Sequence, residues 1–238
     1  MMRHRVLVSW SSGKDSAWML HTLRQRDDVD IVGLVTTVNA TFGRVAMHGV
    51  RNELVQAQAD AAGIPWWPIP LPWPCSNAEY EAIMGGVIER AVAESVTRFA
   101  FGDLFLEDIR AYRERQLAGT GIEPWFPIWG TREQMPQLAE TMLAAGFRAT
   151  LTCVDPKQLS PSFVGREWNA DLLAALPPSV DRCGENGEFH TFCHTGPMFA
   201  HPIRVQPGEI VERDGFWFAD LLPLAAENWP SGDAGGGV

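Results

Sequence analysis

Residues 9–16, Ser-Trp-Ser-Ser-Gly-Lys-Asp-Ser, combine the residue types from which proteins build anion sites. They follow an apolar run at residues 6–8 and precede a helix-like stretch at residues 17–24. A tight loop between a strand and a helix presents free backbone N–H groups and the positive end of the helix dipole to an anion. The segment therefore predicts a phosphate-binding loop, although a capped helix start with an incidental lysine fits the same residues. Its candidate ligand-binding residues are Ser9, Ser11, Ser12, Gly13, Lys14, Asp15 and Ser16.

This loop differs from the Walker A motif, which needs a glycine, four residues and then Gly-Lys-Ser/Thr. Val8 stands where the first glycine would be, and Asp15 follows Lys14. If the loop binds a nucleotide, it does so with another geometry.

The segments around the loop alternate between strand and helix patterns. Residues 31–38 and 97–101 are short runs rich in β-branched or aromatic residues, as in buried parallel strands. Residues 48–62 and 76–95 have helical patterns with capping residues at one end. The alternation predicts an α/β fold with a doubly wound parallel sheet, whose ligands bind at the carboxyl ends of the strands.

Residues 66–74 contain four prolines among tryptophans. A proline removes a backbone donor from a sheet ladder, so this run is not expected to form a central strand. We expect an aromatic-rich loop that packs on the core.

The character of the sequence changes near residue 130, after which short strand-like pieces alternate with proline, glycine and aromatic residues. We expect one domain at residues 1–130 and a smaller α+β domain at residues 131–226. Residues 227–238, with three consecutive glycines, are expected to be disordered.

Composition excludes several classes of protein. The 238 residues include 19 Lys+Arg and 29 Asp+Glu, a formal net charge of −10, which argues against a chain that coats nucleic acid. The N-terminal apolar run is shorter than a signal-peptide core, and no run of about 18 apolar residues could span a membrane. The four cysteines lack the paired spacing of zinc or redox motifs. We expect a cytoplasmic protein with reduced thiols.

The phosphate loop resembles the Ser-Gly-Gly-x-Asp-Ser signature of the PP-loop ATP pyrophosphatases, an adenine nucleotide alpha hydrolase-like superfamily. Ser11, Gly13, Asp15 and Ser16 match the signature, and Ser12 replaces its first glycine. A serine fits this position badly if the backbone there needs a positive φ.

Further segments resemble the diphthine–ammonia ligase branch of this superfamily. They occur in the order of that family at residues 48–51, 101–114, 127–130, 165–166 and 181–191. The resemblance implies a Rossmann-like, HUP-type sheet with ATP and Mg²⁺ as cofactors. It also implies a ligase that adenylates a carboxylate, releases pyrophosphate and AMP, and takes ammonia as nucleophile.

The resemblance assigns roles around the loop and the helix after residue 103. Lys14 would neutralise the leaving charge and Asp15 would hold Mg²⁺, with a plain first-turn helix charge as the alternative for Asp15. Substitution of either residue is expected to abolish adenylation without loss of stability. Asp103 is expected to handle metal or ammonium, and Glu107 to act as general base. Arg110 and Arg113 are candidates for the substrate carboxylate or the AMP phosphate, although spacings of three and four residues also suit a solvated salt-bridge face.

The remaining candidates come from other segments. Glu188 is a candidate catalytic residue, and adenine is expected to lie against Val35 and Thr36. Residues 185–190 are expected to close over the ATP site, although Asn186-Gly187 also suits a type I′ hairpin turn. The expected substrate-binding residues outside the helix are His48, Arg51, Glu185, Asn186 and His190.

Two other functions stay open. A PP-loop enzyme could use another acceptor, either tRNA or a small carboxylate such as a cobalamin-related metabolite. The chain could also bind adenine nucleotides without turnover. The expected partners are ATP, ammonia and a carboxylate acceptor, with no nucleic acid or membrane, and a homo-oligomer is compatible with the sequence.

Overall fold

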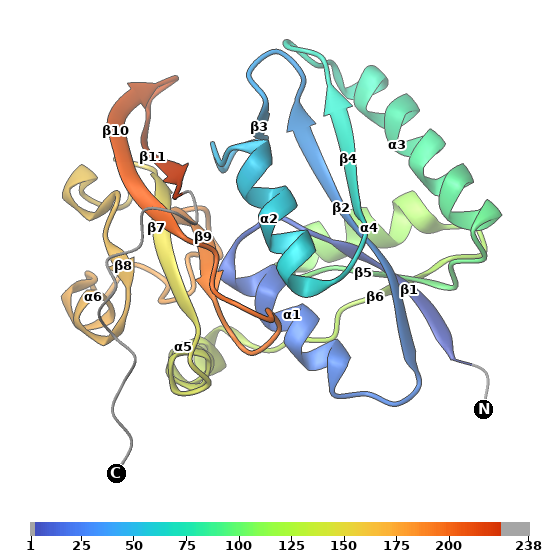
Figure 1. Ribbon diagram of the computed structural model, residues 1–238, viewed down its shortest axis with the longest axis horizontal. Helices are drawn as coiled ribbons and strands as arrows, with labels where there is room; N and C mark the ends of the chain where they lie inside the picture. The colour runs from blue at the N-terminus through green and yellow to red at the C-terminus, as the bar shows by residue number, and fades with distance from the viewer. Residues whose placement is uncertain (1–2, 225–238) are drawn as a thin grey trace.

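The computed structural model describes residues 3–224, which form two β-sheets with helices around them (Figure 1). The first sheet has the strand order β3-β2-β1-β5-β6, and β4 also pairs with β2. All of its pairings are parallel except that of β3 with β2. Its strands are β1 (His4–Ser9), β2 (Val29–Asn39), β3 (Arg44–Val45), β4 (Trp66–Leu71), β5 (Arg98–Ala100) and β6 (Glu123–Trp125).

Helices cover both faces of this sheet because its strands are apolar on both sides. Val6 and Val8 of β1 pack in one core cluster with Leu20 and Leu54 from two helices. Leu7, between them, points to the other cluster, which holds residues of the remaining two helices. The predicted doubly wound α/β fold is confirmed. The four helices are α1 (Lys14–Arg24), α2 (Asn52–Ala62), α3 (Asn77–Ala93) and α4 (Glu107–Leu117).

The prediction of a loop at residues 66–74 was wrong for its first part, since Trp66–Leu71 is the strand β4. Pro68 and Pro70 are exposed, whereas Trp67 and Ile69 are buried. The strand pairs only with β2, so the missing proline donors fall on an unpaired edge.

The second sheet is antiparallel, with the order β10-β11-β7-β8 and with β9 paired to β7. All of its strands lie after residue 147, and each pairing between them is antiparallel. Its strands are β7 (Arg148–Val154), β8 (Glu167–Trp168), β9 (Phe189–Thr195), β10 (Val205–Arg213) and β11 (Phe216–Pro223). The helices around it are α5 (Met135–Ala144), α6 (Ala170–Ala175) and two short 3-10 turns, η1 (Arg132–Gln134) and η2 (Pro161–Phe163).

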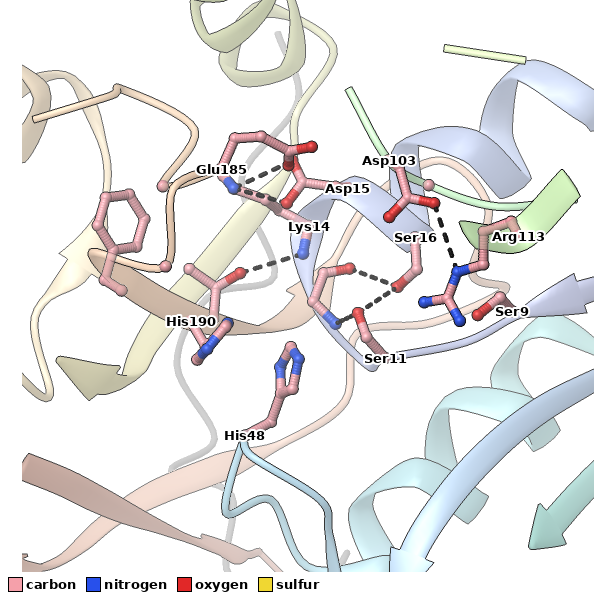
Figure 2. Close-up of a pocket in the computed structure, with 16 residues that line it drawn as sticks. Ser9, Ser11, Lys14, Asp15, Ser16, His48, Asp103, Arg113, Glu185 and His190 are labelled. Atoms are coloured by element: carbon pink, nitrogen blue, oxygen red, sulfur yellow. Dashed lines mark hydrogen bonds and ion pairs between the residues drawn. The ribbon is translucent and has the colours of Figure 1, made fainter. Parts of the chain in front are cut away.

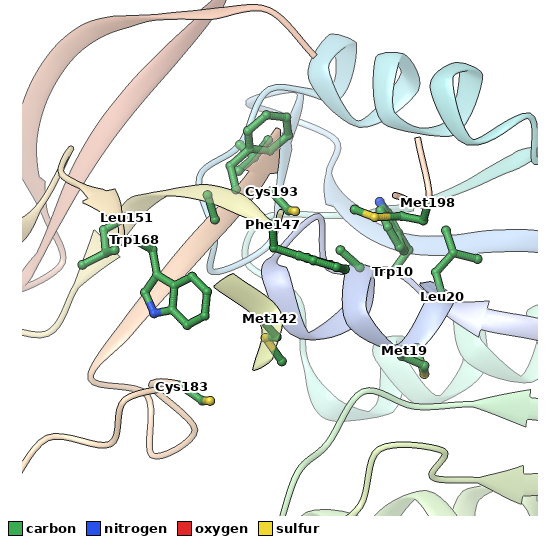
Figure 3. Packing of buried hydrophobic residues seen from close by; sticks show 14 of the residues in the cluster. Trp10, Met19, Leu20, Met142, Phe147, Leu151, Trp168, Cys183, Cys193 and Met198 are labelled. Carbon is green, nitrogen blue, oxygen red and sulfur yellow. The ribbon is translucent and has the colours of Figure 1, made fainter. Parts of the chain in front are cut away.

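The two sheets share one hydrophobic core. Trp10 and Leu20 from the first sheet and its helix belong to the same buried cluster as Phe147, Trp168 and Cys193 (Figure 3). The predicted boundary near residue 130 therefore does not separate two independent cores. The predicted tail at residues 227–238 lies outside the described residues.

Within residues 3–224, no helix combines the length and apolar character needed to cross a bilayer.

Candidate active site

The loop at residues 9–16 has a positive φ at Ser12, a backbone conformation that a serine disfavours. Ser12 has φ +70°, so the position that carries glycine in the signature does adopt the left-handed region here. A serine there is strained relative to glycine. The Ser12 hydroxyl is buried without a hydrogen-bond partner.

Hydrogen bonds within the loop order its other polar groups. The Gly13 N–H donates to Ser11 Oγ at 3.3 Å, and Ser11 Oγ donates to Ser16 Oγ at 3.2 Å. Ser16 Oγ also donates to the Gly13 carbonyl at 2.9 Å. Gly13 is the N-cap of α1, so the loop leads directly into the positive end of that helix.

Strand β9 of the second sheet lies directly against the loop. The Lys14 N–H donates to Thr191 Oγ1 at 3.1 Å, and the Cys193 N–H donates to the Ser12 carbonyl at 2.9 Å. A Cβ at Gly13 would lie 3.1 Å from the Thr191 carbonyl oxygen, closer than nine in ten real Cβ contacts. Glycine therefore lets the second sheet approach the loop this closely without a shift of the neighbouring backbone.

Lys14 is buried, with 1% of its surface exposed. Its Nζ contacts both carboxylate oxygens of Asp15 at 3.0 and 2.9 Å and donates to the Cys183 carbonyl. The ammonium lies over the rings of Trp168 and Phe189, at 5.6 and 5.5 Å from their centroids. Burial lowers the pKa of Lys14, but the surrounding negative groups, Asp15 first among them, raise it by more. The pKa is therefore above its ordinary value, and the side chain stays charged. Lys14 thus joins the loop to the second sheet.

A cavity of about 260 Å³ opens between the loop and the second sheet (Figure 2). Ser9, Ser11, Gly13 and Ser16 line it on the loop side. The other lining residues are Lys14, Asp15, His48, Gly102, Asp103, Arg113, Gly184, Glu185, Gly187, Phe189, His190 and Thr191. Thr191 was not among the predicted site residues, although it ends the segment 181–191 that carried the family resemblance.

Asp103 and Arg113 face each other across one side of the cavity, with Arg113 Nε 3.8 Å from Asp103 Oδ2. Both atoms are buried and neither makes a hydrogen bond within the described chain. Burial raises the pKa of Asp103, and Arg113 lowers it in part. A partly buried carboxylate and guanidinium, each with a buried atom that has an open hydrogen-bonding position, are suited to a polar ligand.

Glu185 brings a third carboxylate to the cavity, from the loop before β9. Its Oε1 accepts a hydrogen bond from the Leu104 N–H at 2.7 Å. Burial, together with the negative charge of Asp15, raises the pKa of Glu185 to about 8. The group can therefore gain or lose a proton near neutral pH.

The raised pKa of Glu185 predicts a pH-dependent stability. The folded chain keeps the proton up to about pH 8, whereas the unfolded chain releases it near the ordinary value of 4.5. The unfolded state thus binds fewer protons between these values, and stability falls as the pH rises through that window. We expect Glu185→Gln to gain several degrees in melting temperature relative to the wild type between pH 5 and pH 8.5. A melting-temperature difference that stays constant with pH, as expected for the exposed Glu81→Gln control, would contradict the shift.

His48 and His190 complete the cavity wall next to the loop. Their ring centroids are 4.4 Å apart, with planes tilted by 36°. Burial lowers the pKa of both rings, with a further contribution from Lys14 and, for His48, from His190; together these effects lower the pKa of His190 to about 4. Both imidazoles are therefore neutral at pH 7.

Several predicted site residues do not line the cavity. Glu107 is exposed at the start of α4, and Arg110 pairs with Glu114 at 2.9 Å. Asp103 precedes α4, so it does not share one helix face with Glu107 and Arg110. The predicted residues that do not line the cavity are Ser12, Val35, Thr36, Arg51, Glu107, Arg110, Asn186 and Glu188.

Glu188 organises the loop that carries Glu185. Its carboxylate accepts hydrogen bonds from the N–H groups of Asp181 and Asn186, at 2.9 and 3.0 Å, and from the Asn186 side-chain amide at 2.8 Å. The carboxylate is buried among these donors. Its geometry fits a residue that positions Glu185.

The alternative of a type I′ hairpin at Asn186-Gly187 is wrong. Gly187 has φ +80°, but Asn186 is not among the described non-glycine residues with positive φ. A type I′ turn needs positive φ at both central residues. The described segment between α6 and β9 contains turns and no strand.

Two carboxylates that line the cavity are of the type that could hold a magnesium ion together with phosphate oxygens. Mg²⁺ in such sites takes one or two carboxylates, phosphate oxygens and water. Asp15 and Asp103 both line the cavity, and Asp103 Oδ2 makes no hydrogen bond with the described residues. Both Asp15 oxygens contact Lys14 Nζ, at 3.0 and 2.9 Å, so Asp15 would bind a metal through its remaining lone pairs. No group of three His, Cys, Asp or Glu residues in the described chain could hold a metal ion by itself, so the phosphates would have to complete the ligand set.

Two family models match the sequence on either side of the loop that joins the sheets. The N-terminal domain of diphthamide synthase matches residues 4–123, and its C-terminal domain matches residues 134–222. The chain belongs to the diphthamide synthase family. This confirms the prediction that the chain is a PP-loop ATP pyrophosphatase. The members of that superfamily are enzymes that use ATP.

Other comparisons add less to the diphthamide synthase assignment. A search of the curated proteins gives no match. Among solved structures, the U34-tRNA thiolase NcsA from Methanococcus maripaludis with its [4Fe-4S] cluster is similar at 16% identity and a TM-score of 0.40. The match covers 60% of this chain and 58% of the thiolase, so the chain spans less than two thirds of that protein.

Proposed function

We propose that this chain is an ATP-dependent ligase that converts a carboxylate into an amide with ammonia. A carboxylate oxygen attacks the α-phosphorus of ATP, and the bond from that phosphorus to the bridging oxygen breaks, so pyrophosphate leaves. Ammonia then attacks the acyl carbon, the acyl–oxygen bond to AMP breaks, and the nitrogen loses one proton. Diphthine-like carboxylates are the substrate class that the family suggests.

One observation carries the proposal: the phosphate loop and the start of α1 open into a cavity that also holds ionisable groups from the second sheet. The departing pyrophosphate needs hydrogen-bond donors and positive charge. Ser9, Ser11 and Gly13 line the cavity at the N-terminal end of α1. The Gly13 N–H and the Ser11 hydroxyl donate within the loop, so they would have to exchange these partners for phosphate oxygens. Magnesium held by Asp15 and Asp103 would neutralise phosphate charge.

The proposal changes two of the roles expected from the sequence. Glu185 replaces Glu107 as the proposed proton acceptor for ammonium, because Glu185 lines the cavity and has a pKa near 8. Lys14 becomes a residue that positions the loop, because its ammonium is already bound to Asp15 and to the Cys183 carbonyl. Arg113 keeps its proposed contact with a carboxylate or phosphate.

An adenine contact at Val35 and Thr36 stays part of the proposal, but it would have to use the backbone. Both side chains are buried, and Thr36 Oγ1 already accepts a hydrogen bond from Trp66 Nε1 at 3.0 Å. The Val35 carbonyl already accepts the Trp10 N–H at 2.7 Å, so an adenine contact would have to use another backbone group of these two residues.

Transfer of sulfur to tRNA, the second acceptor chemistry, finds little support in the thiols. Burial raises the pKa of Cys153 and of Cys193 to about 12, so both are protonated at neutral pH. A thiol in that state is a poor nucleophile and a poor metal ligand.

The products of ATP turnover test the proposed function. With Mg²⁺, ammonium and a panel of carboxylates that includes a diphthine-bearing protein, we expect AMP and pyrophosphate in equal amounts by ³¹P NMR. ADP and orthophosphate would contradict cleavage between the α- and β-phosphorus atoms. ATP binding without any product would favour the nucleotide-binding alternative.

A further inference from the structure

His48 and His190 line the cavity but have no role in the proposed reaction. His48 comes from the loop between β3 and α2, and His190 comes from β9, so the first and second sheets each contribute one ring. Figure 2 shows both rings beside the loop, on the opposite side of the view from Asp103 and Arg113. The pair therefore borders the part of the cavity formed by the phosphate loop.

One nitrogen of this pair lacks a partner. His48 Nδ1 is buried and makes no hydrogen bond with the described residues. An unpaired buried nitrogen is costly, and at a cavity wall it indicates a ligand that would satisfy it. His48 lines the cavity, so a bound group there would lie beside its ring.

The loop that carries His48 is held firmly by the second sheet. Arg44 and Arg51, at the two ends of the loop, both donate to the carboxylate of Asp220 on β11, each at a closest distance of 2.7 Å. Arg44 also donates to the Gly49 carbonyl at 2.7 Å. The contact between His48 and His190 is thus built into the fold.

The charges around the pair favour an anion. Lys14 acts on both rings, and the loop N–H groups and the start of α1 add positive potential. These groups attract a phosphoryl group, and the Asp15 carboxylate at 2.9 Å offsets only part of the charge of Lys14. Two imidazolium rings at 4.4 Å would also repel each other, so the pair can hold one proton and not two. The other ionisable residues that line the cavity are Asp15, Asp103, Arg113 and Glu185.

We propose that His48 and His190 take up one shared proton from solvent when pyrophosphate occupies the cavity, and that the protonated pair donates a hydrogen bond to a phosphoryl oxygen. A ring nitrogen lone pair binds the proton, and no bond to phosphorus forms. The inference rests on the proposed function, which assigns this part of the cavity to the leaving pyrophosphate. It adds that the leaving group is held by a charge that appears only when the anion is present.

Calorimetric titration with magnesium pyrophosphate at about pH 6.5, in two buffers with different ionisation enthalpies, measures the proton uptake directly. We expect the wild type to take up about one proton more than the double variant His48→Gln/His190→Gln. The double variant should also bind pyrophosphate about ten- to a hundredfold more weakly, since a charge-assisted hydrogen bond is lost. Protonation of pyrophosphate itself contributes equally to both proteins and cancels.

The single variants separate a shared proton from a merely structural role. His48→Gln and His190→Gln should each retain the uptake, because the remaining ring can hold the proton and no longer faces a second imidazole. The exposed His201→Asn should behave as wild type. Should the double variant fail to fold, imidazole NMR of the wild type still decides: addition of pyrophosphate must raise the pKa of one of the two rings.

Each remaining outcome counts against the inference. Pyrophosphate binding with equal proton uptake in the wild type and the double variant would overturn it and leave the proposed function intact. Loss of the uptake in one single variant alone would overturn the shared proton. Absence of pyrophosphate binding to the wild type would overturn both the inference and the proposed function.

Discussion

Lys14→Ala is expected to lower the free energy of unfolding by about 3–5 kcal/mol, the usual cost of breaking a buried ion pair. For a chain of this size, that corresponds to a melting temperature about 6–20 °C lower. The substitution removes the partner of Asp15, the bond to the Cys183 carbonyl and the packing against Trp168 and Phe189. This reverses the expectation from the sequence, in which the lysine served the chemistry alone. Thermal unfolding followed by circular dichroism measures the shift.

Lys157→Ala is the matched control, because Lys157 is an exposed lysine near η2. Its melting temperature should stay within a degree or two of the wild type. A similarly small change for Lys14→Ala would mean that the bonds between loop and second sheet do not stabilise the fold.

Asp103→Asn is expected to lower the rate of pyrophosphate release about a hundredfold, in the range seen when one preorganised charged or polar group of an active site is removed. The buried Oδ2 atom has no hydrogen bond, and burial raises the pKa of the carboxyl group, so the negative charge costs stability. The amide removes that cost, and we expect stability to be unchanged or higher. A pyrophosphate-coupled assay and thermal unfolding of the same preparation test both halves.

Asp108→Asn makes the same chemical change at an exposed position in the first turn of α4 and should leave the rate within about twofold, as for most surface substitutions. If Asp103→Asn kept full activity, Asp103 would have no part in binding metal or substrate. If it unfolded the protein, its carboxylate would be structural.

Local patterns predicted three of the six strands of the first sheet, β1, β2 and β5, and the helices beside them. The second helix ends at Gly63 with φ +64°, and the third begins with the capping box at Ser76, both as their residues indicated. The strand β4 was missed because a proline disrupts a strand only where its missing N–H would have donated to a neighbouring strand. Whether Pro68 faces a neighbour or solvent depends on the order of strands in the sheet, which no local pattern contains.

Several of the predicted residues line the candidate cavity. Of the two arginines named as candidates from the sequence, Arg113 lines the cavity and Arg110 does not. The contacts that join Lys14 to Cys183 and His48 to His190 could not be predicted. Lys14 and Cys183 are 169 residues apart, and their meeting depends on how the second sheet packs over the loop.

A crystal structure with Mg²⁺ and α,β-methylene-ATP, which cannot be cleaved between its α- and β-phosphorus atoms, tests the central claim most directly. We expect the triphosphate to lie against Ser11, Gly13 and the start of α1, with the α-phosphorus facing the side of the cavity that holds Asp103 and Glu185. A nucleotide bound elsewhere, or a cavity without nucleotide at saturating concentration, would contradict the assignment of this loop to ATP.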